Sequence, residues 1–238
     1  MEWLEGLLAG NDIFTLRTLS EYGTGLVNTL QLVVLAVLLG LVMALPLALM
    51  RASKRFWISQ PVQVFTYVFR GTPLLVQLYI IYYGSSFVLI DTPLWFIFKD
   101  AFIPALLAFT LNTAAYTTEI IRGAIVATPA GELEAAKAYG MSYWTRTRCV
   151  VLPSAFRRAL PAYTNEVIFM LHASAVAFTV TILDLTGAAY LIYSRFYTPF
   201  SAFIFVACIY LCLTFTIIMI FRKIEFRMLA HLRPRTET

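Results

Sequence analysis

Long apolar segments alternate with shorter polar ones along most of this chain. Five of them run approximately over Leu26–Met50, Val62–Leu89, Phe102–Ile121, Tyr163–Leu183 and Pro199–Phe221. About 20 mostly apolar residues in a helix cross a hydrocarbon layer of ~30 Å, so each segment is long enough to span a membrane. The pattern predicts an all-α integral membrane protein with five transmembrane helices.

The second segment is interrupted at RGTP, residues 70–73, where a charge and a helix breaker lie close together. Proline removes a backbone donor and kinks or breaks a helix. The segment is therefore either one kinked span or a short interfacial helix followed by a span. The pattern gives no partner for the charge of Arg70.

The composition agrees with a membrane location. Apolar residues make up 60% of the 238 residues and charged residues 13%, whereas soluble domains carry roughly 45–50% and about 25%. The opening MEWLEGLLAG has no basic n-region, so no cleavable signal is expected. Trp3, Leu4, Leu7 and Leu8 share one helical face, which predicts an interfacial segment over residues 1–20.

Basic residues are distributed unevenly among the polar segments. Fourteen follow the first span, separate the third from the fourth or follow the fifth: Arg51, Lys54, Arg55, Arg122, Lys137, Arg146, Arg148, Arg157, Arg158, Arg222, Lys223, Arg227, Arg233 and Arg235. The opposite loops hold only Arg17, Lys99 and Arg195. Because cytoplasmic loops are rich in Lys and Arg, this predicts a periplasmic N-terminus and a cytoplasmic C-terminus. Their division among loops beside apolar spans argues against nucleic-acid binding.

The longest polar region, between the third and fourth segments, contains a predicted alanine-rich helix. Thr128 is expected to cap its start, with Pro129 as the first helical residue. The helix is expected to run to Tyr139 and to stop at Gly140, which can adopt the left-handed conformation.

A second short helix is expected over residues 142–151, ending before Pro153. The first helix offers small residues, Ala135, Ala136 and Ala138, and too little apolar surface to fold by itself. From spacing alone, the helix pair is either a solvated connector or a rigid element that sits in the groove of a partner.

The residues of this region form a motif. EAAKAYG, residues 134–140, is followed after nine residues by VVLP, residues 150–153. This pattern resembles the EAA loop of ABC importer permeases, with Val150 standing where the family usually has isoleucine.

The resemblance covers nearly the whole chain. FRGTPLLVQL at 69–78, AYTTEIIRGAI at 115–125 and LPAYTNEVI at 160–168 resemble the polar amino-acid subgroup of these permeases. The segment NEVIFMLHASAVAFT is most similar to membrane subunits of importers for histidine, lysine, arginine and ornithine.

The resemblance implies the type I ABC importer permease fold, with a single transmembrane domain over residues 1–238 and a cytoplasmic EAA coupling loop over residues 123–158. The alanine-rich helix would dock in a cleft of a cytoplasmic ATPase and carry its closure into the membrane. The ATPase-coupling residues would be Glu134, Ala135, Ala136, Gly140, Leu152 and Pro153.

The resemblance also implies partners: an ABC ATPase dimer, a periplasmic substrate-binding protein and a second permease subunit. The second permease is either identical or, as the resemblance suggests, a paralogue that forms a heterodimer. Membrane lipid would surround the spans, in a bacterial inner membrane. The sequence contains no G-x-x-x-x-G-K-[ST] motif, so the chain is not expected to be an enzyme. No cofactor or metal is expected in it, since ATP and Mg²⁺ would be bound by the ATPase.

Ionisable residues inside spans are costly to insert and are candidates for function. Asn112, Tyr116 and Glu119 follow one another at i, i+4 and i+7, which places them along one stripe of the third span. Glu119 could receive the ammonium group of a substrate. Alternatively, it pairs with Arg122 at i+3 on the helix surface.

The fourth span has its own polar residues. His172 shares a face with Asn165, and Glu166 is turned about 100° away. His172 stands where the family usually has lysine, and a histidine is mostly neutral at pH 7, which would remove repulsion of a cationic substrate. The structural alternatives are a buried, hydrogen-bonded histidine that packs against the partner subunit and a pairing of Glu166 with Arg157 or Arg158.

Asp184 follows the fourth span at its outer end. It would face a binding protein or line the gate, or else be a helix-end residue in water, which the sequence favours.

These observations predict an ATP-driven importer permease that moves amino acids, basic ones in the first place, from periplasm to cytoplasm by alternating access. The same importer class for another polar amino acid or an opine is the alternative. A gradient-driven secondary transporter is disfavoured because no inverted repeat is evident. A membrane-embedded enzyme is disfavoured because His172 and His231 have no neighbouring ligand pattern.

Overall fold

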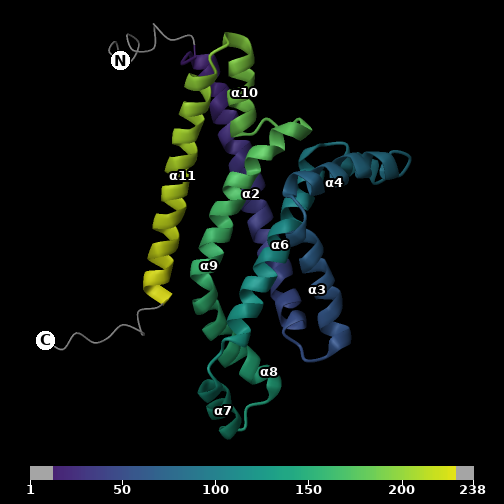
Figure 1. The fold of residues 1–238 in the computed structure, drawn as a ribbon, viewed down its shortest axis with the longest axis vertical. Coiled ribbons are helices and arrows are strands. Elements are labelled where there is room, and N and C mark those ends of the chain that lie inside the picture. Colours follow the sequence, from purple (N-terminus) through teal and green to yellow (C-terminus); the bar gives the residue numbers. More distant parts are fainter. Residues whose placement is uncertain (1–12, 229–238) are drawn as a thin grey trace, which may run out of the picture. The chain divides into compact units, whose positions relative to one another are not determined.

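The structure is a computed structural model and describes residues 13–228. Every regular element within this range is helical, and no strand occurs in it. The elements are α2 (Leu16–Arg51), α3 (Phe56–Gly71), α4 (Leu74–Leu89), α5 (Trp95–Phe98), α6 (Phe102–Val126), α7 (Ala130–Ala138), α8 (Tyr143–Arg146), a π-helix η1 (Thr147–Val151), α9 (Leu152–Ala173), a 3₁₀-helix η2 (Ser174–Val180), α10 (Leu185–Phe196) and α11 (Pro199–Met228) (Figure 1). The apolar face predicted for Trp3, Leu4, Leu7 and Leu8 lies outside the described residues.

The chain divides into two compact units. Among the described residues, the first unit comprises 13–37, 73–110 and 169–215, and the second comprises 38–72, 111–168 and 216–228. Four helices, α2, α6, α9 and α11, contribute residues to both units.

Two described helices, α2 and α11, are long and apolar enough to cross a membrane by themselves. Two pairs that are bent at a short break, α3 with α4 and the segment from α8 to η2 with α10, bring the number up to four among residues 13–228. The expected third span forms one 25-residue helix, α6. It lies outside this set because its centre is polar, with buried Thr110, Asn112, Thr113, Thr117 and Thr118. The five-span topology stays a prediction.

RGTP separates two helices. Helix α3 ends at Gly71 and α4 begins at Leu74, with Thr72 and Pro73 both in extended conformations. Pro73 has no amide hydrogen to donate to the preceding turn, and the residue before a proline is biased away from the helical region. The second apolar segment is therefore not one continuous helix.

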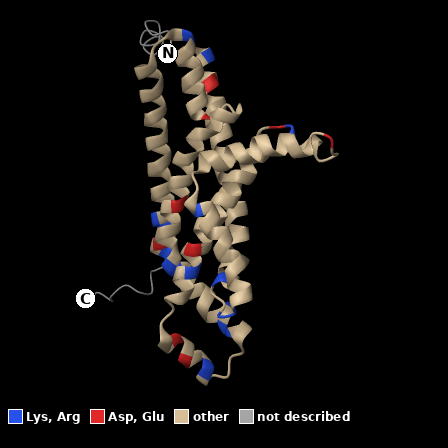
Figure 2. Cartoon of the chain, turned by 45° about the vertical axis from the view of Figure 1, so that its right-hand side comes forward, with Lys and Arg blue, Asp and Glu red and all other residues tan. Residues whose placement is uncertain are grey.

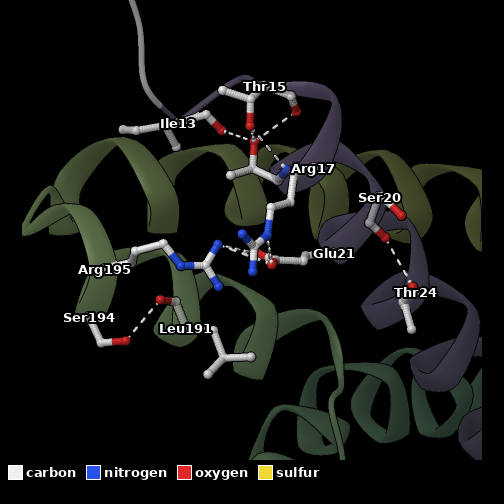
Figure 3. Close-up of polar contacts among 10 residues, drawn as sticks. Ile13, Thr15, Arg17, Ser20, Glu21, Thr24, Leu191, Ser194 and Arg195 are labelled. Carbon is white, nitrogen blue, oxygen red and sulfur yellow. Dashed lines mark hydrogen bonds and ion pairs between the residues drawn. The ribbon is translucent and has the colours of Figure 1, made fainter.

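The core of the first unit is built where α2 meets α10 and α11. Buried Tyr22 and Ile192 belong to one apolar cluster, and Tyr22 contacts Phe205 edge to face with ring centroids 4.8 Å apart. Outside this core, Glu21 on α2 accepts a hydrogen bond from Arg195 Nη1 on α10 at 3.1 Å (Figure 3). Arg17 also pairs with Glu21, at 3.5 Å, but exposed pairs of this kind contribute little to stability.

Asp184 is fully buried in the first unit and caps the start of α10, accepting a hydrogen bond from Gly187 N at 2.8 Å. Two side chains of α2 hold the same turn: Asn28 Nδ2 donates to Leu183 O, and Thr29 Oγ1 accepts from Leu185 N. The expectation that Asp184 lies in water, or faces a partner, is wrong. The first backbone N–H groups of α10 have no partner within the helix, and the Asp184 carboxylate is buried because it accepts a hydrogen bond from one of them.

Small residues allow close packing in the second unit. Ala44, Ala48 and Ile121 form one buried cluster, and Ala124, Ala155 and Ala159 form another. Such residues let helix backbones approach each other, which is the common packing mode in membrane helices.

The two units differ strongly in charge. Among residues 13–228 the first unit holds three basic and four acidic residues, whereas the second holds thirteen basic and five acidic residues (Figure 2). The basic residues of the second unit are Arg51, Lys54, Arg55, Arg70, Arg122, Lys137, Arg146, Arg148, Arg157, Arg158, Arg222, Lys223 and Arg227.

Candidate functional site

The alanine-rich helix is present as α7, but its start differs from the expectation. The first helical residue is Ala130, Pro129 precedes it, and no side chain caps it. Thr128 is buried, and its Oγ1 accepts a hydrogen bond from Arg158 Nη2 at 2.8 Å. The Thr128 hydroxyl, which was expected to cap the helix, therefore accepts a hydrogen bond from an arginine that is distant in sequence.

The end of α7 agrees with the expectation. Gly140 has a φ of +71°, and its N–H donates to Lys137 O at 2.8 Å while Met141 N donates to Ala136 O at 3.1 Å. These two bonds form a Schellman motif, which satisfies the last carbonyls of a helix and requires a residue in the left-handed conformation. Gly140 thus fixes where α7 stops and in which direction the chain leaves it.

The expectation that the second helix ends before Pro153 is wrong. Ser142 caps α8 by accepting from Thr145 N, and the chain continues through η1 directly into α9, with Pro153 in the first turn of α9. Leu152 stays in the right-handed helical region and donates to Thr147 O five residues back. Because this wider turn interrupts the α-helical ladder, the missing donor of Pro153 removes no regular bond.

Three of the six sequence-predicted coupling residues line one cavity. It has a volume of about 380 Å³, and Ala135, Ala136 and Pro153 line it together with Val150 and Arg157. Ala136 is buried, Glu134, Ala135 and Gly140 are exposed, and Leu152 is partly buried. Residues of α7, η1 and the start of α9 therefore form one surface around this cavity, the EAA surface.

Three aromatic side chains of this loop were missed by the sequence reasoning. Tyr139, Tyr143 and Trp144 are 86%, 61% and 73% exposed. Large exposed aromatic residues are typical of the centres of protein interfaces. Their occurrence within a polar loop was the signal that could have identified them.

Asn112, Tyr116 and Glu119 share one face of α6, as their spacing predicted, and this face meets α3 in the second unit. Asn112 Nδ2 donates to Phe69 O at 3.3 Å, and Tyr116 donates from its hydroxyl to Arg70 O at 3.4 Å. Both acceptors are carbonyls at the C-terminal end of α3, which the helix itself leaves without partners. The stripe therefore stabilises the end of α3 at the RGTP break.

Glu119 lies among cations. Its Oε2 accepts from Arg122 Nε at 2.6 Å, and its Oε1 accepts from Arg51 Nε at 3.2 Å and from Thr66 Oγ1 at 3.3 Å. The pairing with Arg122 is confirmed and is joined by a second arginine from α2. The carboxylate links α2, α3 and α6 in the second unit.

Arg70 and Glu166 are also in the second unit. The guanidinium of Arg70 lies over the ring of Tyr116, 5.2 Å from its centroid, a cation–π arrangement. Glu166 is buried, and its Oε1 has no hydrogen-bond partner among residues 13–228. Pairing with Arg158 is not found, since that side chain donates to Ala124 O, Ser154 and Thr128.

Asn165 and His172 are both exposed, whereas Glu166, turned about 100° away on α9, is buried. His172 belongs to the first unit, where its Nε2 lies 3.0 Å from Thr214 Oγ1 on α11. The hydrogen bond of the structural alternative is therefore present, and burial of His172 against a partner subunit stays a prediction. No cluster of three or more potential metal-binding side chains occurs within the described part of the chain.

The family model described as "Binding-protein-dependent transport system inner membrane component" matches residues 25–230. The chain belongs to this family of transport permeases. Within it, the permease is 48% identical to the histidine/lysine/arginine/ornithine transport system permease protein HisM of Escherichia coli strain K12, over 89% of this chain and 90% of that protein. It is 43% identical to the nopaline transport system permease protein NocM of Agrobacterium fabrum, over 87% and 88% of the two chains.

A solved structure supports the same fold. The permease superposes on a chain from a crystal structure of an amino acid ABC transporter with histidines, with a TM-score of 0.79 and 37% sequence identity. The match covers 89% of the permease and 95% of that chain. The helical architecture of the permease is therefore that of an ABC transporter membrane subunit.

Proposed function

We propose that this permease is the membrane subunit of an ATP-driven importer that moves basic amino acids from the periplasm to the cytoplasm by alternating access. The observation that carries the proposal is the 48% identity to HisM over 89% of the chain. A folded EAA surface with its Schellman stop at Gly140 supports the coupling part of the proposal.

The energy for transport would come from a separate subunit. The sequence has no phosphate-binding P-loop motif, so ATP and Mg²⁺ would be bound by a cytoplasmic ABC ATPase dimer. Exposed Glu134 and Ala135, with Tyr139, Tyr143 and Trp144 beside them, would form the surface of α7 and α8 that docks on the ATPase. A periplasmic binding protein would deliver substrate, and a second, paralogous permease would complete the pore.

The proposed topology has five spans in a bacterial inner membrane, with the N-terminus in the periplasm and the C-terminus in the cytoplasm. The excess of basic residues in the second unit, thirteen against three, supports a cytoplasmic location for its loops. Helix α6 would be the third span, and its buried polar side chains would face other helices, not lipid.

The proposed substrate pathway includes Asn112, Tyr116, Glu119, Glu166 and His172. Glu166 is the strongest member, because its buried carboxylate oxygen has no hydrogen-bond partner among residues 13–228 and would attract an ammonium or guanidinium group. Glu119 already holds two arginines, so a role in the pathway would require that network to open during transport.

Import of an opine is the second candidate, because 43% identity to NocM extends over nearly the same share of the chain. Opines and basic amino acids both present a cationic nitrogen and a carboxylate. The permease alone therefore discriminates poorly between them, and the binding protein would decide.

ATP-dependent uptake tests this proposal. The permease, reconstituted in proteoliposomes with its partner subunits and binding protein, is assayed with labelled arginine, lysine, histidine, ornithine, glutamine and nopaline. We expect saturable uptake of the four basic amino acids, abolished by omission of ATP. Uptake of nopaline alone would favour the opine reading, and uptake without ATP would contradict an ABC importer.

A further inference from the structure

The second unit contains an apolar cavity that is lined by none of the proposed substrate-pathway residues. It has a volume of about 470 Å³, within the range of about 300–1,000 Å³ typical of small-molecule sites. Four helices line it: Leu41 comes from α2, Ile121 from α6, Phe156 and Leu160 from α9, and Phe221 from α11.

Arg157 is the one charged side chain among the described residues that line this cavity. Tyr163 on α9 and Phe221 on α11, both in the lining, contact each other edge to face with ring centroids 6.1 Å apart. The cavity therefore combines an apolar surface for a hydrocarbon chain with one guanidinium, a group that binds phosphate through two parallel hydrogen bonds.

The surroundings of the cavity are basic. The second unit has eight more basic than acidic residues within 13–228, counted as thirteen against five, and the thirteen include Arg222, Lys223 and Arg227 in the last turns of α11, close in sequence to Phe221. Basic pockets between helices on the cytoplasmic side of a membrane are a recurrent binding mode for anionic lipid headgroups. This charge favours an anionic occupant over a zwitterionic one.

We propose that this cavity binds one anionic phospholipid, with an acyl chain between α2, α6, α9 and α11 and the phosphate at Arg157. The proposal rests on the membrane location included in the proposed function. Arg157 also lines the cavity of the EAA surface, together with Glu132 and Ala136, so the lipid phosphate would sit at the junction between the membrane and the coupling loop.

Lipid retention by the purified complete importer tests the proposal directly. Native mass spectrometry counts the phosphatidylglycerol molecules that remain after delipidation, and a titration then compares phosphatidylglycerol with phosphatidylcholine. Arg157→Gln removes the phosphate contact, Leu160→Trp fills the cavity without changing the charge, and Arg157→Lys keeps the charge. Arg55→Gln is the matched control, because it removes an exposed cation of the second unit that does not line the cavity.

We expect wild type and Arg55→Gln to retain one more phosphatidylglycerol per permease than Arg157→Gln or Leu160→Trp. The apparent affinity for phosphatidylglycerol should fall at least tenfold in Arg157→Gln and recover in part in Arg157→Lys, with phosphatidylcholine binding unchanged.

Equal retention by all variants would overturn the proposal, as would equal losses for both lipids. A wild-type complex that retains no lipid while Leu160→Cys crosslinks to the second permease would assign the cavity to that subunit. Retention is measured without substrate, so failure of amino-acid uptake would refute the proposed function and leave this result intact.

Discussion

Replacing Gly140 tests whether the direction of the EAA helix matters for coupling. Gly140 has a φ of +71°, and a β-carbon built there meets no atom within 4 Å, so the penalty for a side chain is conformational and not steric. For an L-residue the left-handed region costs roughly 1–2 kcal/mol, and a β-branched residue is least tolerated there. A penalty of about 2 kcal/mol changes a two-state equilibrium by about 25-fold. In Gly140→Val the native end of α7 should therefore open for a substantial fraction of the time.

The assay is ATP-driven uptake by the reconstituted importer, with ATPase co-purification measured in parallel. We expect uptake to fall in the order wild type, Gly140→Asn, Gly140→Ala and Gly140→Val, because asparagine tolerates the left-handed region best of the three. Gly131→Ala is the matched control: it lies in the same helix, meets no atom within 4 Å and needs no positive φ, so it should leave uptake unchanged. Wild-type uptake and normal ATPase association in Gly140→Val would refute the reasoning.

Three further substitutions give separate tests. Gly25→Ala places a β-carbon 2.7 Å from the Asp184 carbonyl oxygen and should lower the free energy of unfolding by about 1–3 kcal/mol. Gly23→Ala is the control, because a β-carbon there meets no atom within 4 Å, and it should leave the free energy of unfolding unchanged. Thermal unfolding in detergent measures both variants. Glu119→Gln leaves Arg51 and Arg122 without their carboxylate and should lower the free energy of unfolding by about 1.5–3 kcal/mol in the same assay. An unchanged free energy of unfolding would show that these ion pairs are weak. Arg158→Lys replaces a planar guanidinium, which donates to both Ala124 O and Thr128, by a single ammonium, so it should reduce coupled ATPase activity. Arg148→Lys, on the exposed surface, should not reduce it.

Local rules predicted those features of the EAA loop and of α6 that depend on neighbours in sequence. The stop of α7 at Gly140 follows from one residue without a side chain, and the shared face of Asn112, Tyr116 and Glu119 follows from helical periodicity. The partners of that face could not be predicted. They are carbonyls of α3, exposed by a break that lies more than 40 residues earlier.

Two of the wrong predictions share one physical cause, which is the approach of groups that are distant in sequence. Thr128 has the residue type of a helix cap, yet Arg158 binds its hydroxyl from 30 residues away. Asp184 follows an apolar segment and has the residue type of a solvated loop, yet the amide of Gly187 and the close approach of Gly25 bury it. Pro153 has the residue type of a helix terminator, yet the π-turn before it lets the helix continue.

The continuous helix and the contacts of Arg158 indicate how a displacement of α7 would be transmitted to α6 and α9. From Tyr143 to Ala173 the chain is helical without a break, so α8 is joined to α9 through η1 and not through a flexible loop. Arg158 on α9 donates to the Ala124 carbonyl in the last turn of α6 and to Thr128, just before α7. One guanidinium thus ties the end of α6, the start of α7 and the body of α9 together. A push on α7 would move α6 and α9 as a unit, because neither end of the loop is free to absorb the displacement.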